Sequence, residues 1–436
     1  MTFAPFSRMV LCAVILLGSV AASRAELAPD AQQAINKGII AAKQQDYLLA
    51  IRYFQEARKI APDAPEIFYD LGLAESKIPG RELRAIAWFG AYLAANPSAP
   101  NAAAVKGEID TLDVRGQSNV SRLIKSVQDA ASQARDNQEF YLGQVAGLWA
   151  EAGDLATAAK ITDHIQDPFR KSYARASIAE GQMGAGDFAG ALKTAELVQE
   201  PKAKSEALEA IAGAQKTAHD VSGAIATLAL ARKAADQIKD AQLRHGRLEN
   251  IAHDQADADD IAGAQNTVAA LGQALRRPDV VKNDPVMKNW SDDSYYIDLA
   301  RHRIVLAQIR AGDIAGAQKT AGLISAKGSK LKEESQKAIE EAIKKGGSAS
   351  AVRPVVLAAS APATVPAITA SDWLSQLDYE LNADLFLDLA GYLKGQHSDN
   401  PQALFSELKI TTEKVIKAQN VIDRMLKQQA TQKIVP

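Results

Sequence analysis

One short pattern recurs through the middle of this chain and limits what the chain can fold into. A turn of glycine and aspartate, or a close variant of it, stands at Gly153-Asp154, Gly186-Asp187, His219-Asp220, Asp259-Asp260 and Gly312-Asp313. Successive aspartates are 33, 33, 40 and 53 residues apart. An apolar pair keeps the same spacing, as Val145-Ala146, Ile178-Ala179, Ile211-Ala212, Ile251-Ala252 and Ile304-Val305. Glycine commonly ends one helix and aspartate caps the next, so the pattern predicts stacked helix pairs that bury their apolar stripes against one another.

Residues 31–97 contain two further helix pairs with more aromatic side chains. Small and large residues alternate at matching positions, namely Gly38, Ala50, Phe54 and Pro62, then Gly72, Ala85, Phe89 and Pro97. Glycine and alanine let two helices approach, and we expect each phenylalanine to fill the space beside them. This segment closely resembles the tetratricopeptide repeat family. Alanines in the later pairs fall where that family places its small residue: Ala191, Ala224, Ala264 and Ala317.

The resemblance implies an all-α, tetratricopeptide-like solenoid for most of the chain. We expect clear repeats over 26–112, a connector helix over 113–137 and diverged repeats over 138–345 that end in a charged capping helix. Gly107 takes the glycine position of a third pair whose second helix is missing. Composition agrees with helices: 47% of residues are hydrophobic, only 6% are aromatic, and alanine is the best helix former.

The two ends of the chain differ from the solenoid. Residues 1–25 have the basic start, the apolar core and the small-residue end of a cleavable signal peptide. They contain the chain's one cysteine, Cys12. Residues 346–370 read as a linker rich in alanine, proline and glycine, and 371–436 as a small helical hairpin. Its second helix has a heptad seam, which permits either a hairpin or self-association: Leu404, Leu408, Thr411, Val415, Ala418, Ile422 and Met425.

The resemblance also implies a partner-binding groove, because that family lines its concave side with fixed positions of the first helix of each pair. The corresponding residues here are Gln32, Ile35, Ile39, Lys43, Glu66, Tyr69, Leu73, Lys77, Tyr173, Glu180, Glu206, Glu209, Lys216, Glu249, His253, His302 and Arg310.

Two features inside the repeats suggest more specific functional sites, a metal site and a functional loop. Glu249, His253 and His302 have groove positions in neighbouring pairs and donor atoms that suit a divalent metal. A solvated groove wall is the simpler interpretation, so we predict no metal site and no cofactor. An insertion near 276–293 carries Trp290 and is followed directly by Tyr295 and Tyr296. It is either a functional loop or a segment that packs Trp290 onto the solenoid.

No catalytic motif supports an enzyme. The Ser406–Lys409 and Ser398–Asn400 matches to penicillin-binding enzymes lie in the wrong order, with no room for that domain. The aspartates between 254 and 260 lack the glycine of a calcium loop. The net charge of −2 gives no reason to expect nucleic acid, and no apolar run after the signal is long enough to span a membrane.

We therefore expect an exported, non-enzymatic scaffold or adaptor that binds a protein or peptide partner in the cell envelope. The alternative is a non-catalytic helical platform of an envelope enzyme system that acts on cell-wall glycan or exported polysaccharide. Self-association through 371–436 is a further expectation.

Overall fold

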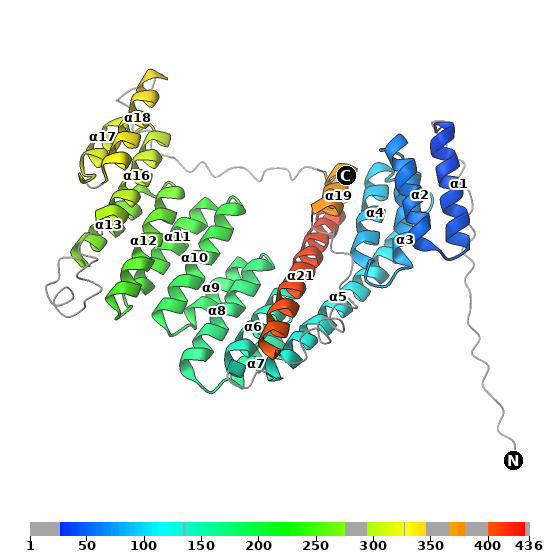
Figure 1. The fold of residues 1–436 in the computed structure, drawn as a ribbon, viewed down its shortest axis with the longest axis horizontal. Coiled ribbons are helices and arrows are strands. Elements are labelled where there is room, and N and C mark those ends of the chain that lie inside the picture. Colours follow the sequence, from blue (N-terminus) through cyan, green and yellow to red (C-terminus); the bar gives the residue numbers. More distant parts are fainter. Residues whose placement is uncertain are drawn as a thin grey trace, which may run out of the picture. The chain divides into compact units, whose positions relative to one another are not determined.

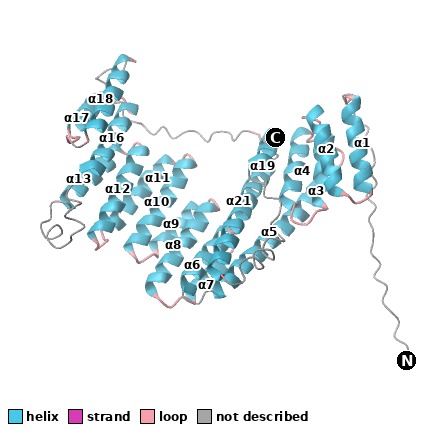
Figure 2. Ribbon diagram, viewed as in Figure 1, coloured by secondary structure: helices cyan, strands magenta, loops and turns pink. Residues whose placement is uncertain are grey.

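The structure is a computed structural model, and it describes residues 27–133, 137–274, 294–326, 328–345, 367–379 and 400–431. All regular secondary structure in these ranges is helical (Figure 2), which confirms the predicted all-α solenoid. The predicted signal peptide, the predicted insertion near Trp290 and most of the predicted linker lie outside the described residues. The chain divides into two compact units, Met1–Val114 with Ile368–Tyr379, and Arg115–Ala367 with Glu380–Pro436.

The first unit consists of two antiparallel helix pairs, the start of a third helix and one helix from much later in the chain (Figure 1). The helices are α1 (Pro29–Lys43), α2 (Tyr47–Ile60), α3 (Pro65–Ser76), α4 (Glu82–Ala95), α5 (Ala102–Gln133) up to Val114, and α19 (Ala370–Tyr379).

Glycine and phenylalanine join the helices of these two pairs as the sequence predicts. A Cβ atom on Gly38 would lie 2.7 Å from Cδ1 of Phe54, and one on Gly72 would lie 2.6 Å from Cδ1 of Phe89. Both rings are at most 2% exposed. The close approach of α1 to α2 and of α3 to α4 therefore depends on the missing side chain, and each ring fills the space that it leaves.

The third helix corrects one predicted boundary. We expected a short helix to Leu112 and a separate connector over 113–137, but α5 runs without a break from Ala102 to Gln133. No proline interrupts this stretch, and glycine weakens a helix interior by only about 1 kcal/mol relative to alanine. Gly107 and Gly116 therefore do not stop it.

The second unit continues with helix pairs in chain order (Figure 1). They are α6 (Gln138–Glu151) and α7 (Leu155–Asp163), α8 (Pro168–Gly184) and α9 (Phe188–Glu196), α10 (Pro201–Thr217) and α11 (Val221–Ala235), α12 (Ala241–Asp257) and α13 (Ile261–Ala274), and α16 (Ser294–Arg310) and α17 (Ile314–Gly322).

The repeated turn works as predicted within every pair of this unit. The residue before each aspartate has a positive φ, from +60° at Asp259 to +86° at Gly153. The aspartate side chain then accepts a hydrogen bond from the backbone N–H three residues later, at 2.9 Å for Asp187 and Gly190. Asp259 and Asp260 are thus a helix end and a cap, as expected for this aspartate-rich run.

The charged helix at the end of the solenoid is α18 (Ser329–Lys344). Its Ile339 is buried with Val305 and Ala317 in a cluster of apolar side chains, while most of its other side chains are exposed. It covers the last pair, as a capping helix must.

The two helices of the predicted C-terminal hairpin are assigned to different units. Helix α19 belongs to the first unit, on α4, whereas α21 (Pro401–Thr431) belongs to the second. Leu404, Phe405, Leu408 and Ile416 of α21 share one apolar cluster with Val145 and Trp149 of α6. One side of α21 is apolar, as predicted, and this side packs against α6 of the solenoid. The segment between Tyr379 and Asn400 lies outside the described residues.

None of the described helices combines the length and the apolar character that crossing a bilayer would take.

Candidate partner-binding face

One predicted groove residue of the first unit, Tyr69 of α3, packs against Tyr92 of α4. The rings of Tyr69 and Tyr92 lie 5.2 Å apart, and the Tyr92 hydroxyl donates a 2.6 Å hydrogen bond to Oδ1 of Asn101. Burial raises the pKa of both tyrosines. Glu66 and Leu73 are half-buried on the same helix, α3, and Lys77 is exposed at its end. Tyr69 is half-buried and Tyr92 is buried, so little of this aromatic pair reaches the surface.

The predicted residues of α1 divide between core and surface. Ile35 is buried, Gln32 and Ile39 are half-buried, and Lys43 is exposed. Gln32 donates to Asn36 on its own helix. These positions contribute little polar chemistry to a shared site.

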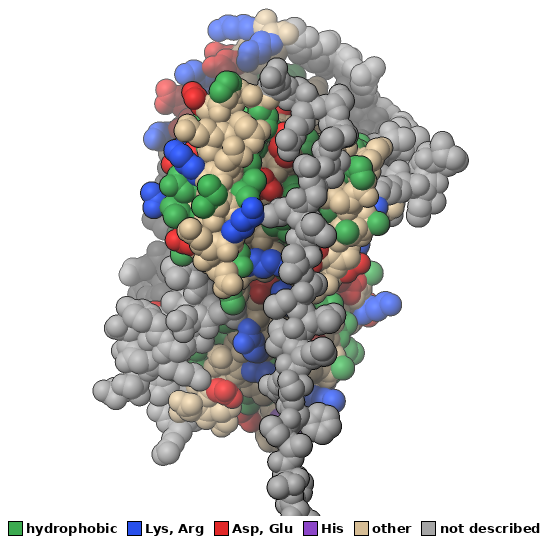
Figure 3. Space-filling view, turned by 90° about the vertical axis from the view of Figure 1, so that its right-hand side faces the viewer, with side chains coloured by type: hydrophobic (Ala, Val, Ile, Leu, Met, Phe, Trp, Pro, Cys, Tyr) green, Lys and Arg blue, Asp and Glu red, His purple; other side chains and the backbone are tan. Residues whose placement is uncertain are grey.

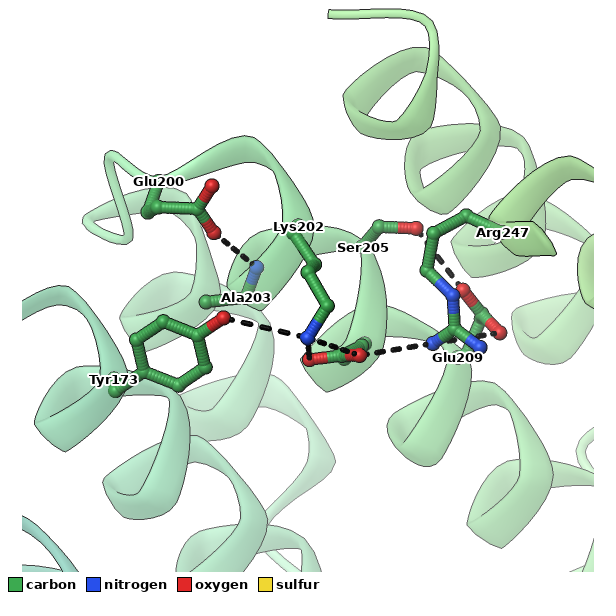
Figure 4. Close-up of polar contacts among 8 residues, drawn as sticks. Tyr173, Glu200, Lys202, Ala203, Ser205, Glu209 and Arg247 are labelled. Carbon is green, nitrogen blue, oxygen red and sulfur yellow. Dashed lines mark hydrogen bonds and ion pairs between the residues drawn. The ribbon is translucent and has the colours of Figure 1, made fainter. Parts of the chain in front are cut away.

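In the second unit, five side chains form a continuous line across three helices, which we call the charged strip: Tyr173, Lys202, Glu206, Glu209 and Arg247 (Figure 4). Lys202 lies 3.0 Å from a carboxylate oxygen of Glu206 and 5.8 Å from the ring centre of Tyr173. Arg247 bridges to Glu206 at 3.3 Å and to Glu209 at 3.7 Å. The strip thus runs from α8 through α10 to α12 with alternating charge.

One carboxylate in the strip is held in unfavourable surroundings. Burial raises the pKa of Glu209 to about 7, although Arg247 and the Ser205 hydroxyl both act in the opposite direction. The Ser205 hydroxyl donates to Glu209 at 3.0 Å. On α12, burial likewise raises the pKa of Asp254, against the positive charge of Lys216. Burial therefore opposes the ionisation of both carboxylates.

Helix α21 lies beside this strip. The charges of Lys409 and Glu413 of α21 and of Glu206 of the strip act on Glu180 of α8, and Ile178 of α8 shares one apolar cluster with Leu404 and Leu408 of α21. Lys409, Glu413 and Lys417 also act on Glu151, a buried residue at the end of α6. Asn420 of α21 donates a 3.1 Å hydrogen bond to the backbone carbonyl oxygen of Glu151.

The three candidate metal ligands do not come together. His302 lies 2.7 Å from the Ser335 hydroxyl of α18 through Nδ1, and His253 has a buried Nε2 without a hydrogen-bond partner among the described residues. Burial lowers the pKa of both histidines, and Arg303 lowers that of His253 further. Glu249 is half-buried on α12. Within the described ranges, no group of three or more histidine, cysteine or acidic side chains is placed to hold a metal ion.

The remaining predicted residues lie at the edges. Arg310 pairs with Asp259 at 2.7 Å, and Lys216 is exposed at the end of α10. Tyr296 is 40% exposed at the start of α16, whereas Trp290 and the Tyr295 side chain lie outside the described residues. The view in Figure 3 likewise shows basic and acidic side chains interspersed with apolar ones on one face.

Sequence reasoning missed four members of these sites, namely Lys202, Arg247, Tyr92 and Asn101. Lys202 was detectable, since it stands four residues before Glu206 on a predicted helix. Arg247 stands 41 residues after Glu206, one residue out of step with the 40-residue interval of that repeat. Asn101 gave no signal, because only the fold brings it to Tyr92.

No protein-family model matches this chain, and among curated proteins none matches it either.

Proposed function

We propose that the protein is an exported, non-enzymatic scaffold or adaptor of tetratricopeptide-like repeats, which binds a protein or peptide partner along the charged strip. The observation that carries this proposal is the position of α21. An amphipathic helix of 31 residues already lies against α6 and beside Glu180, so this side of the second unit accommodates a helix. The charged strip continues the same side over α8, α10 and α12.

The chemistry of the strip favours recognition over reaction. Its groups are ion-paired along a line, from Lys202 to Glu206 to Arg247, and neighbouring repeats place different side chains at matching positions. A catalytic site needs an acid and a base that converge on one substrate atom. A line of alternating charges instead suits an extended ligand whose own charges must match in order and spacing.

Export rests on residues 1–25, whose composition is that of a signal peptide, and on the absence of cysteine after Cys12. A cysteine-free chain suits an oxidising compartment such as a periplasm. The alternative function, a helical platform within an envelope enzyme system, uses the same surface and differs in the partner, which would then be an enzyme acting on glycan.

Site-specific photocrosslinking in intact cells tests the proposal. A photoreactive residue replaces Tyr173 on the strip or, as the matched control, Lys193 on α9, which is exposed and lies outside the strip. We expect a crosslinked partner of defined mass from position 173 and none from position 193. Equal adducts from both positions, or none from either, would contradict binding at the strip.

A double variant that exchanges two charges of the strip adds a second test to the crosslinking experiment. Swapping the pair to Glu206→Arg with Arg247→Glu keeps one ion pair within the chain but ends the alternation of charge, because it sets like charges beside Lys202 and Glu209. We expect it to abolish the adduct at position 173 while the circular dichroism spectrum stays that of the wild type. An unchanged adduct would show that the order of charges is not recognised. Mass spectrometry of the adduct then separates the two functions, since the platform requires a glycan-active enzyme as the captured partner.

A further inference from the structure

Among the α19 side chains that the structure describes, those of residues 370–375, Trp373 makes the main contact with the first unit. Trp373 is fully buried, at 0% exposure, whereas Ser371, Asp372 and Ser375 around it are exposed and Leu374 is half-buried. Among the described helices, α19 packs chiefly on α4. A short helix anchored by a buried aromatic side chain has the form of a peptide ligand bound to a folded surface.

Gly90 of α4 provides the space for this anchor. A Cβ atom built on Gly90 would lie 2.8 Å from Cε3 of Trp373 and closer still to two other indole carbons. All three nearest atoms belong to Trp373, so this glycine accommodates the indole rather than the packing of α4 on α3. By contrast, Gly72 accommodates Phe89 of its own helix pair.

The short helix also carries its own start signal. The Thr369 hydroxyl accepts a 3.2 Å hydrogen bond from the Asp372 N–H, and the Asp372 carboxylate accepts 2.7 Å hydrogen bonds from the N–H and the hydroxyl of Thr369. This reciprocal arrangement is a capping box, which satisfies the free N–H groups at a helix start. The segment therefore supplies the cap of its own helix.

We propose that the Gly90 face of α4 is a binding site for a short, self-capped helix with the pattern Thr-x-x-Asp-Trp, and that α19 is its resident ligand. The site then accepts the same peptide from solution whenever the resident tryptophan is absent. This inference is independent of the charged strip, which belongs to the other unit. It assigns a ligand class to the first unit, namely a helical peptide anchored by one aromatic residue.

A labelled peptide of residues 367–379 tests the site by fluorescence anisotropy against three full-length chains. We expect saturable one-to-one binding to the Trp373→Ala chain, whose site is open. Binding should be at least tenfold weaker to the wild-type chain, whose site is filled, and to the Gly90→Ala/Trp373→Ala chain, whose site is blocked. A peptide with Trp373→Phe should bind within a few-fold, since Nε1 of Trp373 has no hydrogen-bond partner among the described residues, and a Trp373→Ala peptide should not bind.

Gly90→Ala is a mild change in every other respect, because alanine is the better helix former and the indole is what its methyl group would meet. The circular dichroism spectra of the two variant chains should therefore agree with that of the wild type. Absence of saturable binding to a folded Trp373→Ala chain would overturn the proposal, as would equal binding by all three chains. Unfolding of the Trp373→Ala chain would overturn it too, since α19 would then be part of the core rather than a ligand.

Discussion

The Thr267 hydroxyl donates a 2.7 Å hydrogen bond to Oε1 of Gln255, and both side chains are buried. The amide of Gln255 also lies 3.4 Å from Asp260, the cap of α13. One side chain therefore joins the end of the first helix, the turn and the second helix of this pair. The same contacts recur between Gln182 and Thr194 and between Gln215 and Thr227.

The hydrogen bond between Thr267 and Gln255 predicts that replacing threonine lowers the free energy of unfolding more at position 267 than at position 320. Thr267→Val keeps the shape but leaves Gln255 Oε1 buried without its donor, which costs about 1–3 kcal/mol. In the last pair, Oε1 of Gln308 has no hydrogen-bond partner among the described residues. We therefore expect Thr320→Val, at the matching position, to lower the free energy of unfolding by less. Urea denaturation of the two variants measures the difference, and equal losses would show that the Gln255 contact adds nothing.

The positive φ angles at the turns predict a stabilising change. His219 and Asp259 have φ values of +63° and +60°, a conformation that costs a residue with a side chain roughly 1–2 kcal/mol. We expect His219→Gly to raise the free energy of unfolding by about 1 kcal/mol, after the entropy that glycine loses on folding. The reverse change, Gly312→Ala at φ +77°, should lower it by a similar amount. Thermal denaturation checks both, and a destabilising His219→Gly would contradict the prediction.

Glu151 predicts how stability depends on pH. Burial raises its pKa from 4.5 to about 7, so the folded chain holds this proton more tightly than the unfolded chain. Below about pH 4.5 both states are protonated and the group has no effect. As the pH rises toward 7 the unfolded state ionises first, so folding loses stability, by up to about 3 kcal/mol once the pH exceeds 7.

Glu151→Gln removes that loss. We expect the variant to be more stable than the wild type at pH 8 and the difference to shrink toward pH 5, as measured by urea denaturation across this range. Glu340→Gln, at an exposed position on α18, is the matched control. A Glu151→Gln chain whose advantage is the same at both pH values would disprove the pH dependence.

The turns were predictable from the sequence because their chemistry is local. Gly186, Asp187 and Gly190 lie within one turn of chain, and spacing alone indicates the helix end and its cap. The partner of α21 was not predictable, since Leu404 and Leu408 show that one side of the helix is apolar but not which surface covers it. The same holds for Arg247 and Glu206, which meet only because α10 and α12 are neighbours in the stack.

Three glycines that share one repeat position show that sequence spacing alone does not predict which side chain lies beside a residue. By spacing, Gly38, Gly72 and Gly107 are equivalent. In the structure, a Cβ atom on Gly38 or Gly72 would collide with a phenylalanine ring, whereas one on Gly107 would meet nothing within 4 Å. The difference arises because α5 continues straight on, so no second helix returns to cover Gly107.

Alanine replacement should therefore have opposite effects at these positions. Gly107→Ala places a better helix former in an open helix interior, and we expect it to raise the free energy of unfolding by up to about 1 kcal/mol. Gly38→Ala gains the same propensity but forces the Phe54 ring from its place, and overpacking of this kind costs about 1–3 kcal/mol. Urea denaturation of both chains gives the two signs directly. If Gly38→Ala stabilised the chain as much as Gly107→Ala, the Phe54 ring would not occupy the space beside Gly38, and the equivalence suggested by spacing would hold after all.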